Sequence, residues 1–133
     1  MTPELTYLVL SAVLAFVQIM VAATSAALQN GVMSQVGNRE NLPEFSGLCG
    51  RAVRAYRNML ENLALFTILV LAANAAGIST VMTVSGAQLF FYARLAHAVV
   101  YIAGVPFVRS AIWGISVIGM TMIALELLSR AVF

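Results

Sequence analysis

Residues 51–62 read Arg51-Ala-Val-Arg54-Ala-Tyr-Arg57-Asn58-Met-Leu-Glu61-Asn62, and the almost wholly apolar stretch 63–76 follows directly. Four of these polar side chains are spaced i, i+3, i+4 and i+7 and would share one face of a helix: Arg54, Arg57, Asn58 and Glu61. A charged face at the start of an apolar helix is costly in a membrane unless polar groups lie opposite it. The segment therefore predicts a membrane-spanning helix whose first turns carry a polar site.

The chain as a whole is too apolar for a soluble domain. Of its 133 residues, 62% are hydrophobic and only 9% are charged, whereas soluble domains carry about 25% charged residues. At about 20 apolar residues per span, this length accommodates about four spans with short connections. An open strand would leave backbone groups unpaired in lipid. We therefore expect an all-α integral membrane protein that forms a single four-helix domain over residues 1–133.

The expected spans are residues 5–28, 54–76, 82–103 and 108–128. The third span should end at Gly104-Val105-Pro106, because proline cannot continue the helical hydrogen-bond ladder. The longest loop, 30–50, lies beside most of the arginines and is expected to contain the single cysteine, Cys49. This arginine bias places the one–two and three–four loops in the cytoplasm and both termini outside.

The third and fourth spans carry a second polar face. Arg94, His97 and Tyr101 are spaced i, i+3 and i+7, so they share one helix face over about 10 Å. This face lies in the same half of the membrane as the polar face of the second span, so the two can meet. Arg109 and Ser110 then open the fourth span, with Trp113 one turn further along.

Positive charge exceeds negative charge on these faces. All seven basic side chains are arginine, which indicates planar recognition of carboxylates or other anions, although a compositional bias would also explain the missing lysine. Glu61 is expected to be neutralised by Arg94 or Arg57. The remaining arginines either extend to lipid phosphates at the surface or surround an anionic ligand, and the depth of Arg94 favours the ligand. One histidine and one cysteine do not suit a metal site.

Three blocks, in this order, resemble the MAPEG family of membrane-associated proteins in eicosanoid and glutathione metabolism: Arg54-Ala-x-Arg57-Asn58-x-x-Glu61, Ala93-Arg94-x-x-His97-x-x-x-Tyr101 and Arg109-Ser110. The resemblance covers about residues 44–116. It implies four-helix bundles that assemble as homotrimers in the lipid bilayer, with glutathione between neighbouring subunits on the cytoplasmic side. The small size suggests a bacterial member in the inner membrane. No nucleic-acid partner is expected.

The resemblance also implies a role for each residue. Glutathione, the co-substrate, would be held by Arg54, Arg57, Asn58 and Glu61 from the second span and by Arg94, His97 and Tyr101 from the third. Guanidinium groups suit its carboxylates, and a glutamate suits its amino group. Arg109, with Ser110 as a second donor, is the catalytic candidate, because a donor near the sulfur stabilises the nucleophilic thiolate. The thiolate would attack a lipophilic electrophile or reduce a hydroperoxide that arrives from the bilayer.

The chain departs from the family pattern at three places, one of which is the spacing from His97 to Arg109, about one residue different from the prostaglandin-synthase pattern. The eicosanoid synthases have a basic residue at the cytoplasmic end of span one, where this chain reads Leu28-Gln29-Asn30-Gly31 and the nearest arginine is Arg39. Trp113 stands where the family has an aromatic hydroxyl. The alternative function is a non-catalytic accessory subunit or lipid-binding scaffold of a larger membrane complex. A transporter is least favoured, since the sequence shows no pair of broken helices.

Overall fold

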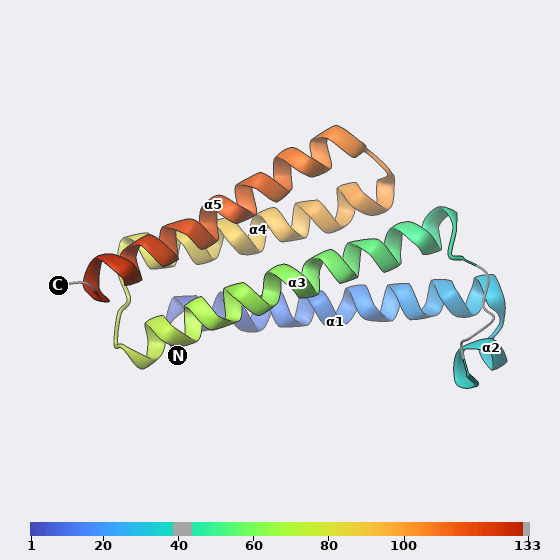
Figure 1. Cartoon of the computed structure of the whole chain (residues 1–133), viewed down its shortest axis with the longest axis horizontal. Helices are drawn as coiled ribbons and strands as arrows, with labels where there is room; N and C mark the ends of the chain where they lie inside the picture. Colours follow the sequence, from blue (N-terminus) through green and yellow to red (C-terminus); the bar gives the residue numbers. More distant parts are fainter. Residues whose placement is uncertain (39–43, 132–133) are drawn as a thin grey trace.

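The computed structural model describes residues 1–38 and 44–131, and its regular elements are all helices. They are α1 (Pro3–Asn30), α2 (Val32–Val36), α3 (Gly47–Ala75), α4 (Val81–Ala103) and α5 (Pro106–Ala131). Four of them are long and lie side by side, while α2 is a short helix beyond the end of α1 (Figure 1). The all-helical prediction is therefore confirmed for the part of the chain that the structure describes.

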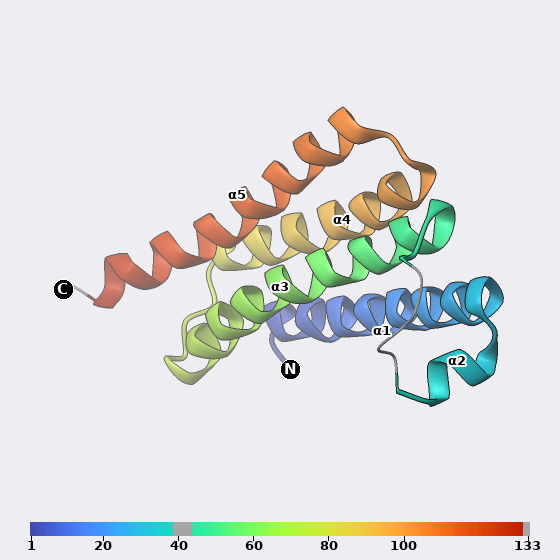
Figure 2. The same cartoon turned by 45° about the vertical axis from the view of Figure 1, so that its right-hand side comes forward.

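The four long helices form two antiparallel pairs. α1 packs mainly on α3, and α4 packs mainly on α5, while contacts between the pairs are less extensive. The two views in Figures 1 and 2 show that α3 and α5 run in the same direction, opposite to α1 and α4. The α3–α4 connection lies at one end of the bundle, and the α4–α5 connection lies at the other. Residues near the start of α3 therefore lie at the same end as the α4–α5 turn.

The first loop is shorter than the sequence predicted. α3 begins at Gly47 rather than near Arg54, and α2 occupies part of the stretch expected to be a loop. Cys49, predicted in that loop, instead lies in the first turn of α3 and is buried in a cluster with Ala22 and Ala26 of α1. Burial of these small side chains between two closely approaching helices explains the earlier start. Arg39, and the acidic residue after it, lie outside the described residues.

Local signals set most of the other helix ends. Thr2 accepts a hydrogen bond from the Leu5 N–H at 3.3 Å, and Pro3 opens α1, where its missing N–H costs nothing. α4 begins with a reciprocal capping box between Thr80 and Thr83. It ends at Ala103, and its C-cap residue Gly104 has a φ of 84°, which favours glycine. As predicted, Pro106 does not continue α4; it becomes the first residue of α5.

A close approach of two glycines brings α4 and α5 together. A Cβ added to Gly86 would lie 2.6 Å from the Gly119 carbonyl oxygen, and one added to Gly119 would lie 2.6 Å from the Gly86 carbonyl oxygen. Between the two pairs, the rings of Phe66 and Phe90 stack with centroids 3.9 Å apart in the main core cluster. These contacts hold the middle of the bundle.

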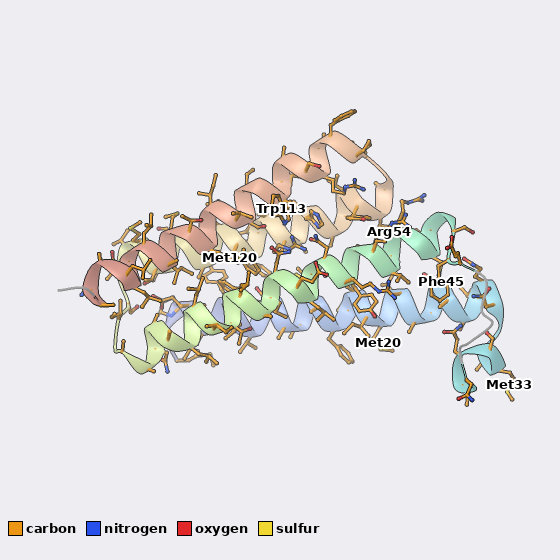
Figure 3. All side chains as sticks on the ribbon, in the orientation of Figure 1. Met20, Met33, Phe45, Arg54, Trp113 and Met120 are labelled. Atoms are coloured by element: carbon orange, nitrogen blue, oxygen red, sulfur yellow. The ribbon has the colours of Figure 1, made fainter. Side chains whose placement is uncertain are left out.

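The chain is an integral membrane protein with helical spans. α1, α3 and α5 are long and apolar enough to cross a membrane. Large apolar side chains such as Phe16 and Met20 are exposed, as lipid contact requires, and Figure 3 shows Met20 on the outer side of α1. Among the described helices α4 does not meet that composition, since it carries Arg94 and His97. Its 23 residues give a length of about 34 Å, enough to cross the hydrocarbon core, but the span at residues 82–103 stays a prediction.

Candidate functional site

Arg94 lies at the centre of the bundle and is only 1% exposed. Its Nη2 donates to the Asn58 side-chain oxygen at 2.8 Å, and its Nε donates to the Met59 sulfur at 3.4 Å. Its Nη1 has no hydrogen-bond partner in the described structure. Arg94 is therefore enclosed by the helices of the bundle, while its depth in the membrane stays a prediction. A buried guanidinium with a spare donor is suited to an acceptor on a ligand.

The predicted pairing of Glu61 with Arg94 or Arg57 is wrong. Within residues 1–38 and 44–131, the recorded ion pair is Arg130 with Glu126, at 2.9 Å. Arg94 bonds instead to Asn58, which lies one helical turn before Glu61 on α3, while Glu61 itself is exposed. The described residues therefore leave the buried charge of Arg94 without a carboxylate.

Three side chains predicted from two separate motifs lie together beside Arg94. His97 is 1% exposed, and its ring packs edge-on against the Tyr101 ring with centroids 5.5 Å apart. The Arg109 guanidinium carbon lies 4.5 Å from the centroid of the same Tyr101 ring, which is cation–π distance. The His97 Nδ1 is buried without a recorded partner. The last turns of α4 and the first turns of α5 thus present an imidazole, a phenol and a guanidinium together.

These side chains line a cavity, named here the polar pocket, of about 240 Å³. It lies between α3, α4 and α5, and its lining residues are Asn58, His97, Tyr101, Arg109, Ser110 and Trp113. The Ser110 hydroxyl is exposed and makes one long hydrogen bond, 3.4 Å, to the Pro106 carbonyl. The structure therefore brings together the predicted catalytic pair and three of the seven predicted binding residues, with Arg94 directly behind Asn58.

The other predicted binding residues lie outside the polar pocket. Arg57 lines a groove of about 350 Å³ between α1 and α3, named here the α1–α3 groove, whose lining is mainly apolar and includes four alanines of α1. Arg54 is exposed, with its Nη1 near Gly50 at the start of its own helix. Glu61 is exposed on the same helix. The single face predicted on α3 is therefore divided, because Asn58 at one edge faces α4 and α5 while Arg57 at the other edge faces α1.

Sequence reasoning missed two side chains that support the site. Met59 is completely buried and accepts the Arg94 Nε–H, a role that no sequence motif indicates. Arg51, part of the charged segment but given no role, donates its Nε–H to the Ile102 carbonyl at 2.9 Å. The sequence gives one indication for Arg51, which is its position near the start of α3. In an antiparallel pair the start of one helix lies beside the end of the next, here α4.

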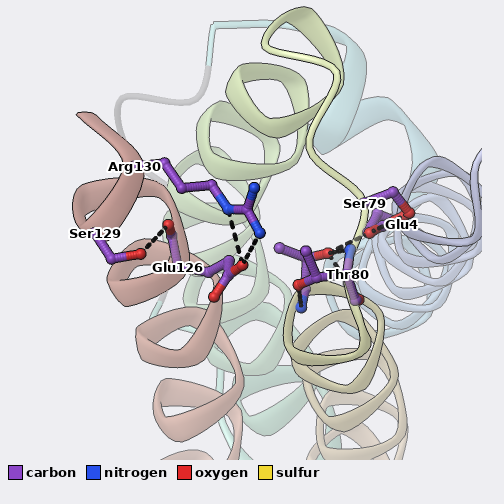
Figure 4. Close-up of polar contacts among 7 residues, drawn as sticks. Glu4, Ser79, Thr80, Glu126, Ser129 and Arg130 are labelled. Atoms are coloured by element: carbon purple, nitrogen blue, oxygen red, sulfur yellow. Dashed lines mark hydrogen bonds and ion pairs between the residues drawn. The ribbon is translucent and has the colours of Figure 1, made fainter. Parts of the chain in front are cut away.

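A second polar cluster, named here the carboxylate cluster, lies at the opposite end of the bundle (Figure 4). Glu4 is 2% exposed. The Ser79 hydroxyl lies 3.0 and 3.1 Å from its two carboxylate oxygens, and the fully buried Thr83 hydroxyl also donates to it. The site lies beside the N-terminus of α4, where negative charge is favoured. The cluster ties the start of α1 to the start of α4.

Comparisons with known proteins identify the chain. The model of the MAPEG family matches residues 5–129, which is nearly the whole chain. A comparison with curated proteins gave no match. The matched residues include all of those placed around the polar pocket. The chain therefore belongs to the MAPEG family, a family of glutathione-related membrane enzymes.

Proposed function

We propose that the protein is a membrane-embedded glutathione-dependent transferase or peroxidase that acts on lipophilic electrophiles or hydroperoxides. The observation that carries the proposal is the polar pocket, in which the Arg109 guanidinium lies 4.5 Å from the Tyr101 ring beside His97 and Ser110. Family membership supports glutathione as the co-substrate. The apolar outer faces of the helices support a second substrate that dissolves in the bilayer.

The residues present fit glutathione. Arg94 and His97 each have a buried nitrogen without a recorded partner, and a buried polar group in that state usually meets a ligand, ion or water. Arginine forks match carboxylates, and glutathione has two. Asn58, already an acceptor for Arg94, keeps an amide N–H₂ that can donate. The donor set therefore suits a small anionic peptide better than an apolar molecule.

Bound glutathione would supply a thiolate as the nucleophile. A free thiol has a pKa of about 8.5, so the chain must favour the anion at neutral pH. Arg109 is the proposed donor to the sulfur, and the Tyr101 ring beneath it restricts the orientation of its guanidinium. The Ser110 hydroxyl, held only by a 3.4 Å bond, can rotate to become a second donor. Both residues would stabilise the negative charge on the sulfur, and the thiolate would then attack the lipophilic substrate.

The divided binding residues support assembly as a homotrimer. Asn58, His97 and Tyr101 line the polar pocket on one flank of α3, whereas Arg57 lines the α1–α3 groove on the other flank. One ligand can engage both sets when a neighbouring copy places its α3 against the pocket. We propose that Arg54, Arg57 and Glu61 complete the site in this way. The proposed setting is a bacterial inner membrane, with both termini outside and the one–two and three–four loops in the cytoplasm.

A glutathione titration of the purified oligomer in detergent tests the proposal. We expect the ultraviolet absorbance of a bound thiolate at neutral pH and a higher melting temperature. Arg109→Gln should raise the pKa of the bound glutathione thiol by about two units if its contribution equals that of one oxyanion donor, which lowers the thiolate absorbance at neutral pH. Arg130→Gln, at the far end of α5, should not change it. Absence of any melting shift at millimolar glutathione, with Arg57→Ala indistinguishable from wild type, would contradict the proposal.

A second candidate function has one specific observation in its favour. The α1–α3 groove combines a mainly apolar lining with one guanidinium, that of Arg57, which suits a lipid with an anionic headgroup. The chain would then be a non-catalytic accessory subunit or lipid-binding scaffold of a larger membrane complex. This function predicts co-purification with a partner complex and no thiolate absorbance when glutathione is added.

A further inference from the structure

The proposed function leaves Arg51 unused, although this residue bridges two helices. Arg51 lies in the second turn of α3, and its Nε–H donates to the carbonyl oxygen of Ile102, in the last turn of α4, at 2.9 Å. Its side chain is partly buried and passes close to Gly104, since a Cβ added there would lie 3.5 Å from the Arg51 Nε. The bond therefore ties α3 to the turn that joins α4 and α5.

The end of α4 explains why an arginine is useful there. The last carbonyls of a helix have no partner within the helix, and the carbonyls of Val100 and Tyr101 are satisfied by the Gly104 N–H at 3.1 Å each. The next carbonyl, that of Ile102, accepts from Arg51. Positive charge is also favoured by the dipole at a helix C-terminus. Arg51 thus satisfies a carbonyl that the turn leaves open.

The same bond lies directly beside the polar pocket. Ile102 follows Tyr101, whose ring contacts both His97 and Arg109. The turn after it is short: α4 ends at Ala103, α5 begins at Pro106, and Arg109 comes in the first turn of α5. Displacement of this turn relative to α3 would move Arg109 away from Asn58 on the opposite wall of the pocket.

We propose that Arg51 is a positioning residue that holds the α4–α5 turn against α3, so that Arg109 keeps its place above Tyr101. Arg54, one turn further along α3, provides the contrast. It is exposed and forms no recorded hydrogen bond within the described residues. This is what we expect of a side chain directed to the membrane surface. The measurement of glutathione binding rests on the proposed function. The measurement of where the turn lies does not, because it needs no ligand.

The test uses Trp113, the only tryptophan of the chain, which lines the polar pocket one turn beyond Arg109. Iodide quenching of its fluorescence is measured in the full-length oligomer in detergent, without glutathione, for wild type, Arg51→Gln and Arg51→Lys. We expect Arg51→Gln to change the quenching constant. Arg51→Lys should return it towards the wild-type value, because an ammonium group can also donate to the Ile102 carbonyl. Arg130→Gln, which removes an arginine far from the pocket, is the matched control.

Glutathione provides the second readout. Loss of a hydrogen bond to a charged group corresponds to about tenfold weaker binding, so Arg51→Gln should lower glutathione affinity about tenfold. It should also move the pH profile of the bound thiolate absorbance to higher pH. Arg51→Lys should restore both in part.

Each outcome decides the proposal. Equal Trp113 quenching in wild type and Arg51→Gln overturns it, even if the melting temperature falls, because the bond would then be purely structural. An effect of Arg130→Gln as large as that of Arg51→Gln also overturns it. If wild type shows no glutathione binding, the proposed function fails, but a quenching change that Arg51→Lys reverses still establishes the positioning role.

Discussion

The two ends of the helical bundle treat buried polar groups in opposite ways. In the carboxylate cluster, Glu4 is buried and both of its carboxylate oxygens meet hydroxyl donors from Ser79 and Thr83. Around the polar pocket, Arg94 and His97 are equally buried, yet each keeps a nitrogen without a recorded partner. Both ends bury charge within the same chain, but the described residues complete the hydrogen bonding at only one of them.

This difference distinguishes buried polar groups that stabilise the fold from buried polar groups that are available to bind a ligand. A buried polar group that lacks a partner costs about 1–3 kcal/mol, and proteins retain such costs where a site has to remain open to a ligand. The carboxylate cluster and the glycine contact between α4 and α5 therefore serve the fold. In the proposed function, the unpartnered atoms of Arg94 and His97 are the ones left for a ligand, at some cost in stability.

The largest expected effect comes from the closely packed part of the bundle. Gly119→Ala would bring a Cβ to 2.6 Å from the Gly86 carbonyl oxygen and 2.9 Å from the Phe90 backbone nitrogen, neither of which can move without shifting a helix. We expect the free energy of unfolding in detergent to fall by about 3 kcal/mol, at the upper end of overpacking costs. Thermal unfolding followed by circular dichroism measures this loss.

Gly114→Ala is the matched control for this substitution. Gly114 lies in the same helix, and a Cβ there meets nothing within 4 Å. Alanine should raise the free energy of unfolding by about 0.5–1 kcal/mol, because glycine is a poor helix former. Equal effects of the two substitutions would show that α4 and α5 are not held by the glycine contact.

The carboxylate cluster should give the next largest effect. Glu4→Leu would leave the fully buried Thr83 hydroxyl without its carboxylate acceptor, and we expect a loss of about 2 kcal/mol in the free energy of unfolding. Glu4→Gln keeps an acceptor oxygen and should lose less. Glu126→Gln removes only an exposed i,i+4 ion pair and should cost about 0.5 kcal/mol or less. If Glu4→Leu were as stable as Glu126→Gln, the distinction between the two ends would fail.

The site end should respond with the opposite sign to Gly119→Ala and Glu4→Leu, and with a smaller change in stability than either. Arg94→Met removes a buried positive charge that has no carboxylate partner in the described residues. Relief of its desolvation should exceed the loss of the bond to Asn58, so the free energy of unfolding should rise by about 1 kcal/mol. The melting shift produced by glutathione should disappear in the same variant. A large loss of stability would mean that Arg94 serves the fold rather than a ligand.

Hydropathy and helical spacing predicted much of this molecule correctly. The apolar stretches became long helices, and the spacing of Arg94, His97 and Tyr101 placed them on one face that also meets Arg109. These predictions succeed because a helix has a fixed angular period, so residues at i, i+3 and i+7 share a face whatever surrounds them.

The same reasoning failed where the result depended on neighbouring helices. The polar face of α3 spans a wide arc, and the positions of α1, α4 and α5 divide it, so that Asn58 and Arg57 line different cavities. The predicted pairing of Glu61 with Arg94 is wrong because opposite charge alone does not decide which side chains meet. The relative depth of α3 and α4 instead brought Asn58 and Met59 to the guanidinium.

The sequence by itself determined that the chain is all-helical, that apolar residues cover its outer faces, and which polar residues share a face within each helix. Only the tertiary structure decided which atoms from different helices meet: Arg94 with Asn58, Arg51 with Ile102, and Glu4 with Thr83. The physical reason is that periodicity is a property of one helix. The depth and rotation of one helix against another depend on the packing of all of them, including contacts as small as that between Gly86 and Gly119.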